Sequence, residues 1–165
     1  MRRLPFDMAS YERRVRGGDC FICGIVRGDR SDEQHVIYRD DRHIAFLSQY
    51  PAQRGYSLVA PVDHREHVVA DFTREEYVAI QLVIHRLGRA LSSVLPTERL
   101  YVLSLGSQQG NSHVHWHVVP LPPGVAYEEQ QFGALMLERA GYLDMSDEEK
   151  GTLAAALGAV MRNTE

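Results

Sequence analysis

The sequence predicts an α+β domain built on a mostly antiparallel sheet. Short runs of alternating apolar residues, separated by tight turns, predict strands, and one long run with apolar residues at steps of three and four predicts a helix. With 165 residues, of which 44% are hydrophobic, the chain has the size of one domain that buries most of its surface. Because short turns join most of the strands, we expect neighbouring strands to pair antiparallel.

The first three strands are expected in the N-terminal half. Residues 36–40 and 43–48 alternate around an Asp-Asp-Arg turn, which predicts a hairpin. A loop over residues 51–55 leads to a third strand at residues 56–60. Pro61 is expected to end that strand, because proline has no N–H to donate to a sheet.

A long helix is expected over residues 73–95, between the third and fourth strands. Thr73 and Glu76 have the spacing of a capping box, and Pro96 stops the run. The apolar residues of this segment share one helical face: Tyr77, Ile80, Ile84, Leu87, Leu91 and Val94.

Two further strands and a second helix complete the predicted fold. Residues 100–105 and 113–119 alternate again, and Pro120 is expected to close the second run. Ser146 and Glu149 repeat the capping-box spacing, so a final helix is expected to begin there and to run to about Arg162.

Charge and composition narrow the class of partner. The formal net charge is −4 and the pI is about 6.1, so no nucleic acid polymer is expected as a partner. A nucleotide is compatible, because backbone N–H groups and a few histidines can hold phosphate. The N-terminus lacks the apolar core of a secretory signal or a membrane span, so we expect a cytoplasmic protein with no membrane partner. Residues 1–19 end in two glycines and predict a peripheral arm, with a short helix over residues 7–15.

Histidines occupy every second position of the run His113-Val-His115-Trp-His117. On a strand all three would point to one face and the apolar residues to the other. Imidazole changes charge near neutral pH, so three together indicate handling of protons, phosphates or metals. The outer pair would lie about 13 Å apart on a straight strand, so all three can hardly bind one zinc ion.

Cys20 and Cys23 are the only cysteines and form a Cys-x-x-Cys pair. The spacing is compatible with metal ligands, a redox pair or two unrelated buried thiols. A redox pair is disfavoured, because the surrounding sequence lacks a thioredoxin-like βαβ pattern.

The histidine run resembles the signature of the histidine triad (HIT) superfamily. Residues 20–26, 43–47 and 57–64 resemble the N-terminal half of that family in the same order, so the resemblance covers about residues 20–120. It implies a HIT-like fold with a five-stranded antiparallel sheet. It also implies that the chain forms a homodimer and acts as a nucleotide hydrolase or transferase. We therefore expect a catalytic domain at 20–120, preceded by the arm and followed by an extension at 121–165 packed on the same domain.

The resemblance implies a role for each histidine. His115 would attack the α-phosphorus, His117 would stabilise a phosphate oxygen or the leaving group, and His113 would orient the cluster. The glycine-rich turn before the triad would bind phosphate, and Ser48 holds the position that contacts the ribose. Members often carry Gly-His before the third strand, where this chain has Gly55-Tyr56. The resemblance does not identify which of four residues contacts the leaving group: Gln108, Gln109, Asn111 or Ser112.

Several relatives in that family bind zinc with a cysteine pair and two histidines. The matching residues are Cys20, Cys23, His64 and His113, which would form a closed, structural zinc site. Two reduced thiols without a metal are the alternative.

The expected substrate is a dinucleoside polyphosphate, a nucleoside phosphoramidate or a related nucleotidyl ester. One rival is a nucleotide-binding regulatory or scaffold protein with little turnover, and another is a zinc hydrolase that uses the triad as metal ligands. Residues 127–132 would fold over the nucleotide or cross the dimer interface. The other histidines are expected on the surface: His35, His43, His67 and His85.

Overall fold

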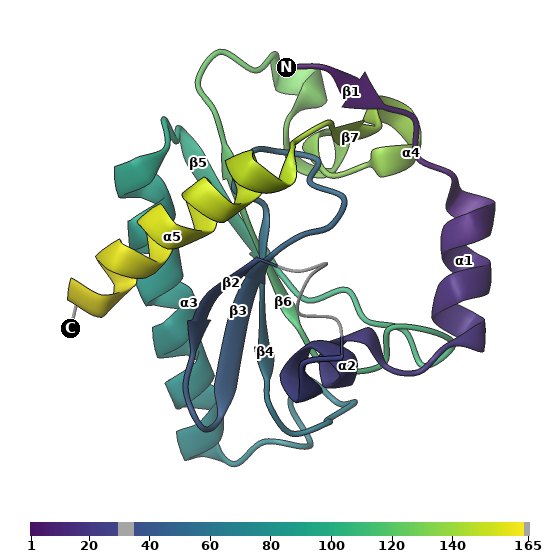
Figure 1. Cartoon of the computed structure of the whole chain (residues 1–165), viewed down its shortest axis with the longest axis vertical. Helices are drawn as coiled ribbons and strands as arrows, with labels where there is room; N and C mark the ends of the chain where they lie inside the picture. Colours follow the sequence, from purple (N-terminus) through teal and green to yellow (C-terminus); the bar gives the residue numbers. More distant parts are fainter. Residues whose placement is uncertain (30–34, 164–165) are drawn as a thin grey trace.

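Five strands form one antiparallel sheet in the order β2-β3-β4-β6-β5 (Figure 1). The computed structural model describes residues 1–29 and 35–163. The strands are β2 (Val36–Arg39), β3 (His43–Leu47), β4 (Ser57–Pro61), β5 (Arg99–Leu103) and β6 (Trp116–Leu121). This confirms the predicted α+β class with a five-stranded antiparallel sheet.

Two long helices cover one face of the sheet, α3 (Arg74–Val94) and α5 (Asp147–Asn163) (Figure 1). The capping box of α3 is present: Thr73 Oγ1 accepts from the Glu76 N–H, and the Glu76 carboxylate accepts from the Thr73 N–H. Ser146 and Glu149 make the same pair of hydrogen bonds before α5. Both predicted helix starts are confirmed. The apolar faces of α3 and α5 form the main core with inward residues of the sheet.

Helix α2 (Phe21–Arg27) covers the opposite face of the sheet (Figure 1). It buries Ile22 and Ile25 against β3 and β4. Helix α1 (Met8–Gly17) lies farther out and begins at Asp7, whose carboxylate accepts from the Ser10 N–H. The predicted helix over residues 7–15 is therefore present, and it extends two residues farther.

The N-terminal segment pairs with the chain just before α5 in a second, two-stranded sheet. Strand β1 (Arg3–Leu4) pairs antiparallel with β7 (Tyr142–Leu143). Between β6 and β7 the chain forms the short helices η2 (Tyr127–Glu129), η3 (Gln131–Ala134) and α4 (Leu137–Ala140). Within the part of the chain that the structure describes, no helix is both long and apolar enough to cross a membrane.

Strand β6 differs from the strand predicted at residues 113–119. It begins at Trp116 instead of His113, because the chain before it leaves the sheet and the Val114 N–H donates to the carbonyl of Arg65 at 2.7 Å. It also continues through Pro120, which was predicted to close it, and ends at Leu121. Proline is tolerated there because the pairing of β4 with β6 ends at Val118.

Candidate active site and metal centre

The three triad histidines lie on the sheet face that α2 covers. Only His117 belongs to β6, while His113 and His115 lie in the irregular segment before it. The apolar residues between and after them still alternate into the main core: Val114, Trp116 and Val118. The carbonyl of His113 lies 2.7 Å from Nδ1 of His115, and the rings of His115 and His117 have centroids 4.8 Å apart. The three residues are therefore brought together, although two of them are not on a strand.

His115 has a defined tautomer. A carbonyl oxygen only accepts hydrogen bonds, so Nδ1 donates to the His113 carbonyl and Nε2 carries the lone pair. The side chain is 4% exposed, and the Phe21 ring lies beside it with centroids 6.2 Å apart. Burial lowers the pKa of His115, although the hydrogen bond to the His113 carbonyl opposes this. The neutral form, with its lone pair on Nε2, is therefore favoured.

His117 contacts a residue that the sequence marked only as a departure from the family pattern. Its Nδ1 lies 2.9 Å from the hydroxyl of Tyr56, which is 8% exposed. Its Nε2 is buried and has no hydrogen-bond partner among the described residues. Burial, and to a lesser extent the charge of His115, lower the pKa of His117 to about 3, so this ring is neutral.

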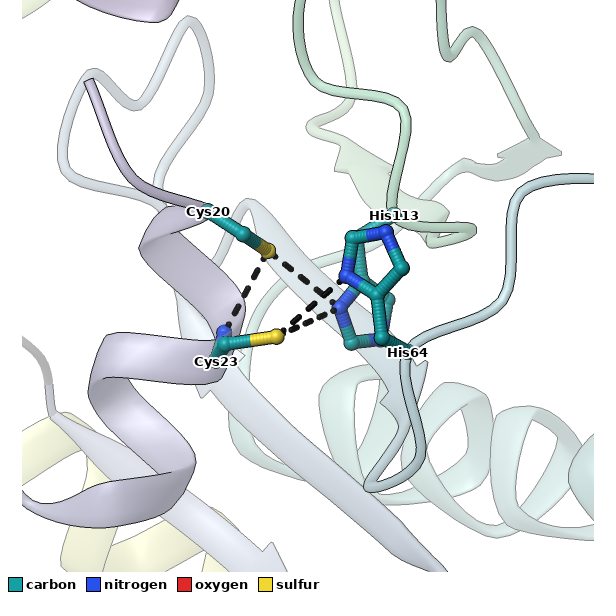
Figure 2. A group of neighbouring side chains, drawn as sticks. All are labelled: Cys20, Cys23, His64 and His113. Carbon is teal, nitrogen blue, oxygen red and sulfur yellow. Dashed lines mark hydrogen bonds between the residues drawn. The ribbon is translucent and has the colours of Figure 1, made fainter.

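Figure 2 shows four side chains that converge from three parts of the chain: Cys20, Cys23, His64 and His113. Their ligand atoms all lie within 4.8 Å of one another. Nδ1 of His113 lies 3.4 Å from Sγ of Cys20, and Nδ1 of His64 lies 3.3 Å from Sγ of Cys23. A tetrahedral ion with bonds of about 2.3 Å to sulfur and about 2.0 Å to nitrogen separates such ligands by about 3.5 Å. The four predicted ligands thus have the spacing of a zinc site.

The outer nitrogens of the two histidines are also engaged. Nε2 of His113 lies 3.0 Å from the carbonyl of Pro61, so it donates and leaves the Nδ1 lone pair toward the cysteines. Nε2 of His64 lies 3.2 Å from the carboxylate of Glu66. Such outer partners orient metal-ligating histidines. Glu66 also accepts from the hydroxyl of Ser112 at 3.1 Å, so it links these two cysteines and two histidines to the glycine-rich turn. Glu66 was not among the predicted site residues, although it stands two residues after His64.

A cavity of about 680 Å³ opens beside the triad. Its wall includes His117 and all five additional residues that the family resemblance assigned to nucleotide binding: Ser48, Gln108, Gln109, Asn111 and Ser112. His115 is not part of the wall and lies deeper, next to the ring of His117. The structure therefore gathers the predicted binding residues around one cavity.

Helix α1 forms part of the same wall, although the N-terminal arm was predicted to be peripheral. The hydroxyl of Tyr11 accepts from the side-chain amide of Asn111. Val15 packs closely on Gly110: a Cβ at position 110 would lie 3.1 Å from Cγ2 of Val15. Arg14 donates to the Tyr50 hydroxyl at 2.7 Å and has no carboxylate within ion-pair distance among the described residues. Its guanidinium lies over the rings of Tyr11 and Tyr50, 5.5 and 5.2 Å from their centroids. The arm thus places a cation at the cavity.

Of the histidines predicted to be on the surface, His67 and His85 are exposed. His35 is half-buried, with its Nε2 3.7 Å from Asp147. The prediction is wrong for His43, which is 7% exposed because it lies in β3, a strand whose residues are all buried. Its Nδ1 lies 3.1 Å from both carboxylate oxygens of Asp40. Tyr127 and Phe132 are exposed and do not line the cavity.

Residues 29–123, more than half of the chain, match the family model of the HIT domain. An uncharacterized HIT-like protein of Saccharolobus solfataricus is 28% identical over 104 residues, which cover 61% of this chain and 73% of that protein. Protein hit of Bacillus subtilis is 30% identical over 105 residues, or 62% of this chain and 70% of the relative.

Solved structures give the same result for the fold. A Zn-bound histidine triad family protein from Mycobacterium smegmatis has a TM-score of 0.70 at 27% identity, covering 89% of this chain and 98% of that one. A hypothetical histidine triad nucleotide-binding protein from Sulfolobus tokodaii has a TM-score of 0.67 at 21% identity, covering 87% and 93%.

Proposed function

The chain belongs to the HIT family, and on that premise we propose that it binds a nucleotide and breaks or exchanges a bond at the α-phosphorus. The substrate class is a dinucleoside polyphosphate, a nucleoside phosphoramidate or a related nucleotidyl ester. Nucleotide binding is supported by the cavity beside the triad and by the similarity in fold to the hypothetical nucleotide-binding protein of Sulfolobus tokodaii.

The hydrogen bond between His113 and His115 is the observation that carries this proposal. It assigns the proton of His115 to Nδ1, which leaves a lone pair on Nε2 of a buried, neutral imidazole. An unprotonated nitrogen held in one orientation meets the requirement for a nucleophile. His113 contributes through its carbonyl, because both of its ring nitrogens are already engaged.

The reaction then proceeds in two displacements. Nε2 of His115 forms a bond to the α-phosphorus as the bond to the leaving group breaks, and the electron pair of that bond goes to the leaving group. The leaving atom, or a phosphoryl oxygen, accepts a hydrogen bond from His117. Water or another acceptor next attacks the phosphorus and gives up a proton, and the bond to His115 breaks. Each displacement inverts the phosphorus, so two of them retain its configuration.

The cavity wall supplies the remaining groups that such a reaction requires. Phosphoryl transfer depends chiefly on positioning and charge stabilisation. We assign phosphate contacts to the turn before the triad, which carries Gln108, Gln109, Asn111 and Ser112, and the ribose contact to Ser48. Arg14 supplies a positive charge at the same wall.

Cys20, Cys23, His64 and His113 would hold a zinc ion. The spacing of their ligand atoms and the outer partners of both histidines fit it, and the Mycobacterium smegmatis protein is described as Zn-bound. Bound there, zinc supplies a cross-link between α2, the end of β4 and the segment before β6. All four ligands come from the protein, so no position is open for a substrate. A zinc hydrolase that uses the whole triad is disfavoured, because His115 and His117 lie outside this cluster.

Turnover of a panel of nucleotide substrates tests the proposal. The wild-type protein should act on at least one of the three substrate classes, and His115→Ala should lower kcat by at least a thousandfold while nucleotide affinity changes little. His85→Ala, which removes an exposed histidine of α3, is the matched control and should remain active. Tight nucleotide binding with no turnover of any substrate would favour the regulatory rival.

A further inference from the structure

The ring of His117 has one engaged and one free nitrogen. Nδ1 lies 2.9 Å from the Tyr56 hydroxyl, whereas Nε2 is buried and unpaired among the described residues. We propose that Tyr56 is a positioning residue: its hydroxyl donates to Nδ1 of His117 and keeps the proton of the neutral ring on Nε2, where a substrate oxygen accepts it. The statement that a substrate oxygen accepts this proton rests on the function proposed above.

The direction of the hydrogen bond follows from the relative strengths of the two possible donors. A neutral imidazole has one N–H and one lone pair, and a phenol can either donate or accept. Either direction leaves one donor unpaired among the described residues, the Nε2 N–H of His117 or the Tyr56 hydroxyl. A phenol O–H is a more acidic donor than a neutral imidazole N–H, and an imidazole nitrogen is a more basic acceptor than a phenol oxygen, so O–H···N is the stronger hydrogen bond. The phenol therefore donates, and the ring proton lies on Nε2.

Burial keeps both partners in the forms that this bond needs. Tyr56 is 8% exposed, and burial raises the pKa of its phenol well above the usual value, so the hydroxyl keeps its proton. The lowered pKa of His117 keeps that ring neutral, so Nδ1 retains its lone pair. Neither group changes its protonation near neutral pH.

The backbone fixes the position of the phenol. Gly55 has a φ of +84°, and a Cβ at this position would lie 2.5 Å from Cδ1 of Leu95, so only glycine fits. The Tyr56 ring then packs in a small cluster with Ala52 and Val119. Because this cluster holds the ring in place, the hydroxyl orients His117 instead of following it.

The two neighbouring rings are left with complementary nitrogens. His115 presents a lone pair on Nε2, and His117 presents an N–H on Nε2. The first can form the bond to phosphorus while the second donates to an oxygen of the same phosphoryl group or of the leaving group. Without Tyr56, the proton of His117 would distribute between the two nitrogens and the ring would lose its orienting contact.

Tyr56→Phe tests the proposal, with Tyr101→Phe as the matched control. Tyr101 packs against the same cluster, but its hydroxyl accepts from the Gln131 N–H and makes no contact with the triad. Two quantities are measured: the nitrogen-15 NMR spectrum of the histidine side chains without substrate, and kcat and KM on the substrate that the panel identifies. His117→Gln assigns the resonances.

The wild type should show a protonated Nε2 and an unprotonated, hydrogen-bonded Nδ1 at His117. Tyr56→Phe should shift the Nδ1 resonance and lower kcat about tenfold with KM changed less than twofold, while Tyr101→Phe alters neither. A protonated Nδ1 in the wild type overturns the proposal, and so does a Tyr56→Phe variant with an unchanged Nδ1 resonance or an unchanged kcat. If the wild type turns over no nucleotide, the proposed function fails, whereas the spectrum still decides whether Tyr56 donates to His117.

Discussion

The carbonyl oxygen of His113 accepts a hydrogen bond from Nδ1 of His115 at 2.7 Å. The side chain of His113 meanwhile points its Nδ1 toward the two cysteines. One residue therefore joins the cluster of Cys20, Cys23, His64 and His113 to the proposed nucleophile, through its ring on one side and its backbone on the other. This arrangement predicts that the cluster stabilises the fold and takes no part in the chemical step.

Protein purified without added metal should contain about one zinc ion per chain. His64→Ala should lower both the zinc content and the melting temperature, because the site would lose one of its four ligands. His67→Ala, which removes a neighbouring exposed histidine outside the cluster, is the control and should change neither. Metal analysis and thermal unfolding measure the two effects. A metal-free wild-type protein that is as stable as His64→Ala would contradict the zinc assignment.

Arg14→Gln should weaken the binding of a nucleotide with several phosphates about tenfold, because the cavity would lose a charge-assisted hydrogen-bond donor. Arg13→Gln is the matched control: Arg13 lies on the same helix and is exposed, but it bonds Ser10 and does not line the cavity. Titration calorimetry with His115→Ala as the background avoids turnover. Equal affinities for the two arginine variants would exclude Arg14 from the binding site.

We expect a homodimer formed through β5 and α3. Among the described strands β5 pairs only with β6, so its other edge is open, and Val78 and Leu82 on α3 and Val102 on β5 are exposed apolar side chains. Residues of α3 and β5, His85 and Val102 among them, also line one shallow pocket. Sedimentation should find a dimer at micromolar concentration. Leu82→Glu should give a monomer, whereas Val69→Glu, which changes an exposed residue outside α3 and β5, should not. A wild-type monomer would refute the prediction.

The half-buried carboxylate of Asp40, which contacts the buried ring of His43, predicts a pH dependence of stability. Burial of Asp40 opposes ionisation, but hydrogen bonds from Tyr38, from His43 and from the backbone lower its pKa to about 2. A carboxyl whose folded pKa is depressed stabilises the protein above its unfolded pKa of about 3.9, and this contribution is lost as the pH falls toward 2. Asp40→Asn should therefore reduce the free energy of unfolding at pH 6 by about 1 kcal/mol, because the carboxylate is partly exposed and solvent weakens its interactions.

Denaturant unfolding of the wild type and the variant at pH 6 and near pH 2 measures that difference, which should shrink at the lower pH. Asp41→Asn changes the adjacent, exposed carboxylate and serves as the control. A difference between wild type and Asp40→Asn that is the same at both pH values would show that the charge of Asp40 does not contribute.

Local patterns were sufficient to predict most of the fold. The capping boxes at Thr73 and Ser146 are interactions over three residues, and apolar spacing locates each strand of the main sheet to within about three residues at either end. Pairing of β1 with β7 was not predicted, because it joins two-residue segments that lie about 140 positions apart in the sequence. The start of β6 was misplaced because alternation reports which face a side chain occupies and does not report whether the backbone pairs with a neighbour.

The family signature led to the site residues, but their contacts depend on the strand register. Tyr56 reaches His117 because Leu58 of β4 pairs with His117 of β6, and no local pattern contains that pairing. The partner of the buried His43 ring could have been predicted from the sequence, since Asp40 stands only three residues before it. Arg14 and Tyr11 were missed because the position of α1 against the cavity depends on contacts with residues about 100 positions away.

The stereochemical course at phosphorus tests the role of His115 most directly. The substrate is the one that the panel identifies, prepared with sulfur on its α-phosphorus in a single configuration and hydrolysed in oxygen-18 water. Two in-line displacements, the first by Nε2 of His115 and the second by water, predict a product with retained configuration. Clean inversion would mean a single attack by water and would contradict the nucleophilic role of His115.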